Sequence, residues 1–75
     1  MTDRGGGNPP FAVDARGMRC PWPVLRAARA MRDHRAIVIR ADDPIAATEL
    51  QALAAERGWS FAQGKPAEFH LRRDG

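Results

Sequence analysis

The sequence predicts an α/β (α+β) fold: a two-layer sandwich of order β-α-β-α-β-β, in which two helices cover one face of a four-stranded mixed sheet. Four short segments alternate apolar and polar residues or are rich in β-branched residues, as is typical of strands. Two segments with helical spacing separate the first three strands, so the first strand-helix-strand unit is expected to be a right-handed parallel crossover. A short turn between the last two strands predicts a hairpin. Two helices can cover only one face of such a sheet.

One small domain accounts for the chain. Its 75 residues are enough for a single hydrophobic core. Residues 1–10 are polar and rich in glycine and proline, so we expect a disordered tail, followed by the domain over residues 11–75. The core candidates are the larger apolar side chains of the domain: Phe11, Val13, Leu25, Met31, Ile37, Ile39, Leu50, Leu53, Trp59, Phe61, Phe69 and Leu71.

The first half of the domain is predicted to contain a strand over residues 11–15 and a helix over residues 21–33. Between them lies a loop in which Gly17 supplies a turn that other residues dislike. Pro21 suits the first helical position, and Pro23 is tolerated because first-turn N–H groups have no partner in the helix. The inner helix face is expected to consist of Val24, Leu25, Ala28 and Met31, and Arg26, Arg29 and Arg32 lie off it.

The second half begins with a β-branched strand over residues 36–40. Asp43 is expected to cap a helix that starts at Pro44, continues to Arg57 and stops at Gly58. The inner stripe of this helix is Ala46, Leu50, Leu53 and Ala54. Strands over residues 59–63 and 67–72, joined by a Gly-Lys-Pro turn, complete the predicted sheet.

Composition excludes several classes of protein. The single cysteine excludes a disulfide scaffold and fits a reducing compartment. We expect a cytoplasmic protein, because the first ten residues have no apolar stretch and no segment is long enough to span a membrane. The net charge of +3 suits an acidic protein partner or a polyanion, and it is too modest to indicate nucleic-acid binding by itself. No cofactor is expected, and no metal site, since His34 and His70 are distant from each other and from Cys20.

The only cysteine, Cys20, stands between a strand and a helix entrance, in Cys-Pro-Trp-Pro. Helix N-termini and neighbouring cations favour the thiolate, the reactive form of cysteine. The cations expected to act here are Arg16, Arg19 and Arg26. If Cys20 is the N-cap, its sulfur would accept the N–H of Trp22. The sequence therefore predicts a reactive thiol; the alternative is a buried, inert core cysteine.

Residues 14–23, which read DARGMRCPWP, closely resemble the signature of the TusA/SirA-like sulfur-carrier proteins, D-A-x-G-L-x-C-P-x-P. Further similarities are Ala41-Asp42-Asp43-Pro44, Glu49-Leu50 and Gly58-Trp59, which match the family's second helix and its borders. The departures are Met18 for leucine, Glu49 where aspartate is common, and Trp22 between the two prolines.

The resemblance implies the family's β-α-β-α-β-β fold and its activity, a persulfide carried on Cys20. The donor would be a cysteine desulfurase or rhodanese-type protein. The acceptor protein would pass the sulfur toward tRNA thiolation, molybdenum-cofactor biosynthesis or sulfur oxidation. By the same resemblance, Pro21 and Pro23 form the scaffold of the motif, and Asp14 and Gly17 flank it. A transient carrier of this kind is expected to be monomeric.

Other interpretations stay open at this point. Trp22 either fills the small core or is an exposed anchor for a partner. Arg26 either lies on a solvated helix face or belongs to a docking patch. The domain as a whole is either a carrier-type sulfurtransferase or a non-catalytic regulatory module with Cys20 as a redox switch. A nucleic-acid-binding domain that uses the arginines is the third alternative.

Overall fold

The computed structural model describes residues 9–74, and the tail predicted over residues 1–10 lies almost entirely outside that range. The elements follow the predicted order: β1 (Phe11–Asp14), α1 (Trp22–Asp33), β2 (Ala36–Arg40), α2 (Ala46–Arg57), β3 (Ser60–Gln63) and β4 (Glu68–Arg72). Each strand lies within one or two residues of its predicted bounds. The predicted fold class is confirmed.

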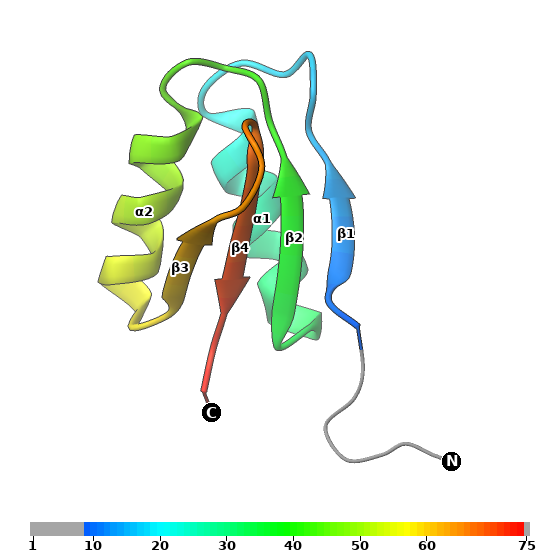
Figure 1. The fold of residues 1–75 in the computed structure, drawn as a ribbon. Helices are drawn as coiled ribbons and strands as arrows, with labels where there is room; N and C mark the ends of the chain where they lie inside the picture. The colour runs from blue at the N-terminus through cyan, green and yellow to red at the C-terminus, as the bar shows by residue number, and fades with distance from the viewer. Residues whose placement is uncertain (1–8, 75) are drawn as a thin grey trace.

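The four strands form one mixed sheet in the order β1-β2-β4-β3 (Figure 1). β1 pairs with β2 in parallel, as a strand-helix-strand unit requires. β4 pairs antiparallel with β2 on one side and with β3 on the other, so the predicted hairpin is confirmed. α1 packs against β1 and β2, α2 packs against β3 and β4, and the two helices contact each other.

The core lies between the sheet and the two helices. Alternate strand residues point into it: Val13 pairs with Ile39, and Ile39 pairs with Phe69, to form one buried row across three strands. Ile37 and Leu71 form the next row. The predicted inner stripe of α2 is confirmed, because Ala46, Leu50, Leu53 and Ala54 are all buried.

The predicted inner face of α1 is confirmed for three of its four residues, because Met31 is buried and Val24 and Ala28 are partly buried against the core. The buried residues are Pro23, Ala27 and Met31, whereas Leu25 is 49% exposed. Small side chains at consecutive turns let the helix lie close to the sheet, and this close approach rotates the leucine out to solvent. Phe11 is also 46% exposed instead of buried; its ring stacks on His34 with 3.9 Å between the ring centroids.

α2 begins two residues later than predicted. Its N-cap is Ile45, and residues 44–45 form a turn before the first helical residue, Ala46. The side chain of Asp43 caps this turn, with Oδ1 accepting the N–H of Ile45 at 3.2 Å. Gly58 ends the helix in the left-handed region, with φ of 74°, as its position predicts.

The topology brings two loops together. Since β1 and β2 are parallel, their carboxyl ends meet at the same edge of the sheet. The β1–α1 loop, which contains Cys20, therefore lies beside the β2–α2 loop, at the top of the sheet in Figure 1. The chain reaches β1 and leaves β4 at the opposite end.

Candidate functional site

Cys20 lies at the end of the β1–α1 loop, two residues before α1, and is exposed. The alternative of a buried core thiol is therefore wrong. The chain has no second cysteine, so an internal disulfide is impossible. An exposed thiol on a short loop is accessible to a group on another protein.

Three carboxylates hold this loop in place. Asp42 Oδ1 accepts the N–H of Gly17 at 2.9 Å, and Asp43 Oδ2 accepts the N–H of Cys20 at 2.7 Å. Gly17 has a φ of 82°, a left-handed conformation that glycine adopts without strain. Asp14 accepts both the N–H and the guanidinium of Arg16, at 2.9–3.1 Å. Charge-assisted bonds from two segments thus position the cysteine backbone.

A third contact reaches the sulfur itself. The Cys20 thiol donates a hydrogen bond to Glu49 Oε2 at 3.0 Å, across 29 residues of sequence. This bond, together with desolvation and the negative charges of Glu49 and Asp43, raises the pKa of the Cys20 thiol. The contact with Glu49 therefore opposes ionisation of the thiol.

The prediction that nearby arginines favour the thiolate is wrong. Arg16 forms a bidentate ion pair with Asp14, at 2.9 Å, and its positive charge is thereby matched. Arg19 acts on Asp43, whose pKa is lowered mainly by the N–H groups of Cys20 and Ile45 and less by this guanidinium. Arg26 lies on the exposed face of α1. The groups that control the Cys20 thiol are carboxylates.

The predicted N-cap is also wrong. The N-cap of α1 is Pro21, which has no side-chain cap bond. The N–H of Trp22 donates to the carbonyl of Arg19 at 2.8 Å, so it does not reach the sulfur of Cys20. The turn that leads into α1 uses up the donor that the sequence interpretation had assigned to the thiol.

Some of the predicted site residues build the loop around Cys20, and others form the exposed surface next to it. Asp14, Gly17 and Pro21 belong to the loop around Cys20. Pro23 lies in the first turn of α1 and is buried. Trp22 is 59% exposed, which excludes the core-filling alternative. Trp22, Leu25 and Ile45 are exposed large apolar side chains on the two segments that flank Cys20.

Sequence reasoning missed the site roles of Asp42, Asp43 and Glu49. Asp43 was expected only to cap the second helix, and Asp42 and Glu49 were considered only in the comparison with the family pattern. Parallel pairing of the first two strands was already predicted, and it requires residues after each strand to meet at one edge. That rule alone places Asp42 and Asp43 beside the cysteine loop, and Glu49 one turn into the helix that follows.

A shallow hollow of about 260 Å³ adjoins the thiol partner Glu49. Its lining residues come from α2 and from the start of α1: Pro21, Val24, Glu49, Ala52, Leu53 and Glu56. The floor is apolar, and two glutamates one above the other on α2 give it negative charge. We call Asp42, Asp43 and Glu49, with Cys20 between them, the carboxylate end.

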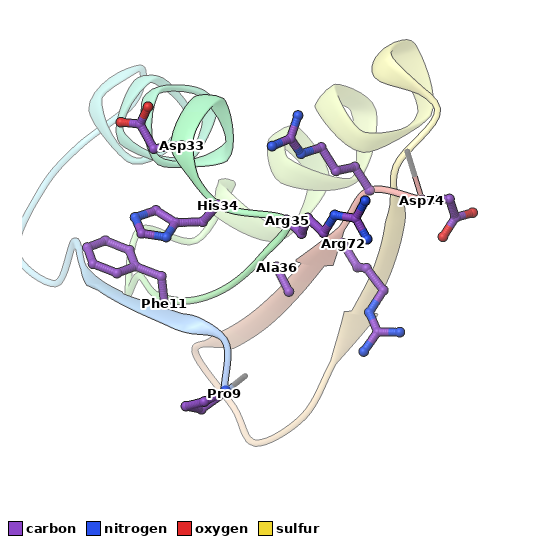
Figure 2. A pocket seen from close by; sticks show the side chains of 9 residues that line it. Pro9, Phe11, Asp33, His34, Arg35, Ala36, Arg72 and Asp74 are labelled. Atoms are coloured by element: carbon purple, nitrogen blue, oxygen red, sulfur yellow. The ribbon is translucent and has the colours of Figure 1, made fainter. Parts of the chain in front are cut away.

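The opposite end of the sheet carries three arginines and two aspartates, Asp33 and Asp74. A hollow of about 680 Å³ lies there between the end of α1 and the ends of β2 and β4. Arg35 and Arg72 line it, and Figure 2 shows them together with the stacked rings of Phe11 and His34. Arg73 also lines it. We call Arg35, Arg72 and Arg73 the arginine end.

Two further features concern the described part of the chain. Over residues 9–74, neither helix combines the length and the apolar character needed to cross a bilayer. The same residues contain no group of three or more histidine, cysteine, aspartate or glutamate side chains arranged to hold a metal ion.

Comparison with known proteins identifies the family. A family model described as "Sulfurtransferase TusA" matches residues 12–72. A candidate sulfur carrier protein of Archaeoglobus fulgidus is 36% identical over 59 residues, which cover 75% of this chain and 77% of the relative. The crystal structure of a SirA-like protein from Desulfitobacterium hafniense shares the fold, with a TM-score of 0.71 and 23% identity, covering 87% of this chain and 99% of that one. The chain belongs to the TusA sulfurtransferase family, whose general role is to carry or transfer sulfur.

Proposed function

We propose that Cys20 accepts a sulfane sulfur from a donor protein, holds it as a persulfide and passes it to an acceptor protein. The observation that carries this proposal is an exposed thiol, the only one in the chain, on a loop fixed by carboxylates from another segment. A carrier needs an accessible sulfur in a defined position. The donor and acceptor enzymes supply the remaining chemistry, so the carrier needs no cofactor of its own.

The reaction balances without an oxidant. The Cys20 sulfur attacks the outer sulfur of a donor persulfide, R–S–SH, and a new S–S bond forms on Cys20. The donor S–S bond breaks, and the donor leaves as a thiolate that takes up one proton. Delivery to an acceptor thiol is the same exchange in reverse order, with Cys20 as the leaving group.

The surface around the thiol supports docking by another protein. Trp22, Leu25 and Ile45 are 59%, 49% and 47% exposed, respectively. Exposed aromatic and aliphatic side chains beside a functional group are typical of interface anchors. We assign to this surface a donor such as a cysteine desulfurase or rhodanese-type protein, and in turn the acceptor. The destinations we propose are tRNA thiolation, molybdenum-cofactor biosynthesis or sulfur oxidation, for a cytoplasmic monomer.

The redox-switch alternative has less support. Redox-sensing cysteines have a low pKa, since the thiolate is the form that oxidants attack. Here Glu49 raises the pKa of the Cys20 thiol, which disfavours oxidation of the isolated protein. A thiol whose ionisation is disfavoured in the isolated protein fits a carrier better than a sensor.

The test is intact-protein mass spectrometry under non-reducing conditions. The purified protein is incubated with a cysteine desulfurase and cysteine, beside Cys20→Ser. We expect a mass gain of one sulfur atom that a reductant removes and that is absent from the variant. If several desulfurases and rhodanese-type donors give no gain on a thiol that still reacts with iodoacetamide, the carrier proposal fails.

A further inference from the structure

We infer that Glu49 is the proton acceptor for the Cys20 thiol when sulfur is loaded and the proton donor when sulfur is delivered. This inference rests on the proposed carrier function and adds to it a catalytic residue on α2. Its basis is the direct contact between the thiol and Glu49 Oε2, at 3.0 Å. A general base must lie within hydrogen-bond reach of the proton that it removes, and Glu49 does.

Glu49 is held where this contact needs it. It lies in the first turn of α2, and its N–H donates to the carbonyl of Ile45 at 3.1 Å. The side chain is half-buried on the wall of the apolar hollow, beside Pro21 and Leu53. A short helical turn and a packed side chain keep the carboxylate near the sulfur without the help of a partner.

The neighbouring groups cannot take the same role. Both oxygens of Asp43 already accept backbone N–H groups, from Cys20 and from Ile45. Arg19 is a cation and accepts no proton at neutral pH. His34 stacks on Phe11 at the arginine end, and His70 contacts Glu68 on β4. Among the residues that the structure describes, Glu49 is the carboxylate in contact with the thiol.

A docked partner makes this proton acceptor necessary. In the isolated protein, water can take the proton of the exposed thiol. When a donor protein covers the loop, water is excluded, so the proton that leaves the sulfur during the attack needs an acceptor within hydrogen-bond reach. The raised pKa of the Cys20 thiol agrees with this reasoning, since the same contact that disfavours the thiolate supplies the proton acceptor.

The loading step then has a place for each atom. As the Cys20 sulfur attacks the outer sulfur of the donor persulfide, its proton moves to Glu49 Oε2. The donor S–S bond breaks, and the donor thiolate that leaves takes this proton, so Glu49 returns to its ionised form. There is no net change of oxidation state, because one persulfide and one thiol become another persulfide and another thiol.

Delivery uses the same group in the opposite direction. The acceptor thiol attacks the outer sulfur of the Cys20 persulfide and passes its proton to Glu49. Glu49 then protonates the Cys20 sulfur as the S–S bond breaks. A thiol of high pKa leaves slowly as a thiolate, so protonation of the leaving sulfur matters more here than for an ordinary cysteine.

The test compares Glu49→Gln with Glu56→Gln. Glu56 lines the same hollow on the same helix, so its variant removes one negative charge nearby and leaves the thiol contact intact. Two rates are measured for each protein at pH 7.5: alkylation of Cys20 by iodoacetamide, and single-turnover loading from a persulfidated cysteine desulfurase. Glu49→Asp, which restores a shorter carboxylate, is the rescue variant.

We expect the two rates to move in opposite directions in Glu49→Gln. Alkylation should become severalfold faster, because the thiolate is no longer disfavoured. Loading should become about 100-fold slower, the low end of the range for general acid–base catalysis. Glu56→Gln should change each rate less than twofold, and Glu49→Asp should recover part of the loading rate.

Three results would overturn the inference. If both rates rise together in Glu49→Gln, the carboxylate only suppresses the thiolate. If Glu56→Gln matches Glu49→Gln, general negative charge is responsible. If loading in Glu49→Gln equals that of the wild type, Glu49 has no role, while the carrier function stands. Absence of any loading in the wild type overturns the carrier function as well, and so separates the two failures.

Discussion

The carboxylate end and the arginine end lie at opposite edges of the same sheet and differ in almost every property that matters to a thiol. At the carboxylate end, Asp43 and Glu49 hold the backbone and the sulfur of Cys20, across 23 and 29 residues of sequence. At the arginine end, Arg35, Arg72 and Arg73 surround a larger hollow with no cysteine in it. The net charge of +3 therefore describes the whole chain but not the surroundings of its reactive group.

This difference teaches that local charge follows from topology. Arg16 and Arg19 precede Cys20 directly, yet the groups that act most strongly on its sulfur come from α2 and the β2–α2 loop. Parallel strands place the residues that follow them at one edge, so distant carboxylates become near neighbours. Proximity in sequence is a weaker guide to an electrostatic field than proximity in the fold.

The largest effect is expected when the carboxylate end loses the hydrogen bonds between Asp43 and the backbone N–H groups of the loops. Asp43→Ala leaves the N–H groups of Cys20 and Ile45 without their acceptor. The loop should become mobile, and loading from a cysteine desulfurase should fall about 100-fold, as small misplacements of a reacting group can cause. Hydrogen exchange at the Cys20 amide, measured beside the loading rate, should accelerate.

Asp43→Asn and Asp33→Ala are the controls for this prediction. The asparagine keeps an oxygen acceptor and should retain more loading than alanine. Asp33 lines the hollow at the arginine end, so its loss should leave both the loading rate and the Cys20 amide unchanged. Equal effects of Asp33→Ala and Asp43→Ala would show that the two ends do not differ in the way described.

A smaller effect is expected from the exposed aromatic residues at the two ends. Trp22 is 59% exposed beside Cys20, and Phe11 is 46% exposed at the far end. Trp22→Ala should raise the KM for the desulfurase about five- to thirtyfold, as the loss of an interface anchor does, while stability changes by at most about 0.5 kcal/mol. Phe11→Ala should leave KM unchanged. A larger effect of Phe11→Ala on KM would place the docking surface at the arginine end.

The pH dependence of alkylation tests whether the groups around Cys20 raise or lower the pKa of its thiol. Glu49 raises the pKa of the folded thiol, so folding favours the protonated form. That contribution to stability is present below the pKa of the unfolded chain's thiol and is lost as the pH rises through the pKa of the folded state. At pH 7.5 the native protein should therefore react with iodoacetamide severalfold more slowly than the urea-unfolded chain, although the thiol is exposed.

The two alkylation rates should converge once the pH exceeds the pKa of the folded thiol, where the cysteine is ionised in both the native and the unfolded chain. Faster reaction of the native protein at pH 7.5 would mean that the arginines control the thiol after all. The Glu49→Gln variant should remove most of the difference between the native and unfolded chains.

The fold could be predicted from the sequence because its signals are local. Strand alternation, the β-branched run over residues 36–40 and the stop at Gly58 each depend on neighbours in the chain. The exposure of Leu25 on α1 could not be predicted in the same way. Hydrophobicity favours Leu25 as a core residue, but Pro23 and Ala27 are small enough to let the helix approach the sheet, and they occupy the interior instead.

The same distinction between local signals and contacts made by the fold applies to the site residues. Cys20, Gly17 and Asp14 could be found because they belong to one continuous motif. The roles of Asp42, Asp43 and Glu49 depend on contacts across 23 to 29 residues, which no local pattern records. Helix dipole and adjacent arginines both suggested a low thiol pKa, and one hydrogen bond from another helix reverses that direction.

The smallest effect, and the last test of the comparison, concerns the arginine end. We expect the triple variant Arg35→Gln, Arg72→Gln, Arg73→Gln to change two rates less than twofold: alkylation of Cys20 by iodoacetamide at pH 7.5, and loading from the desulfurase. The two ends are separated by the length of β2, five residues, or about 17 Å at the usual rise of a strand. This exceeds the Debye length of about 8 Å at physiological ionic strength, so exposed charges there are largely screened at the thiol.

Repeating the loading assay at low salt makes the test more sensitive, because a long-range contribution from the arginines would appear there first. A fall in loading that grows as salt is removed would mean that the arginine end steers the donor, and the two ends would then serve one function.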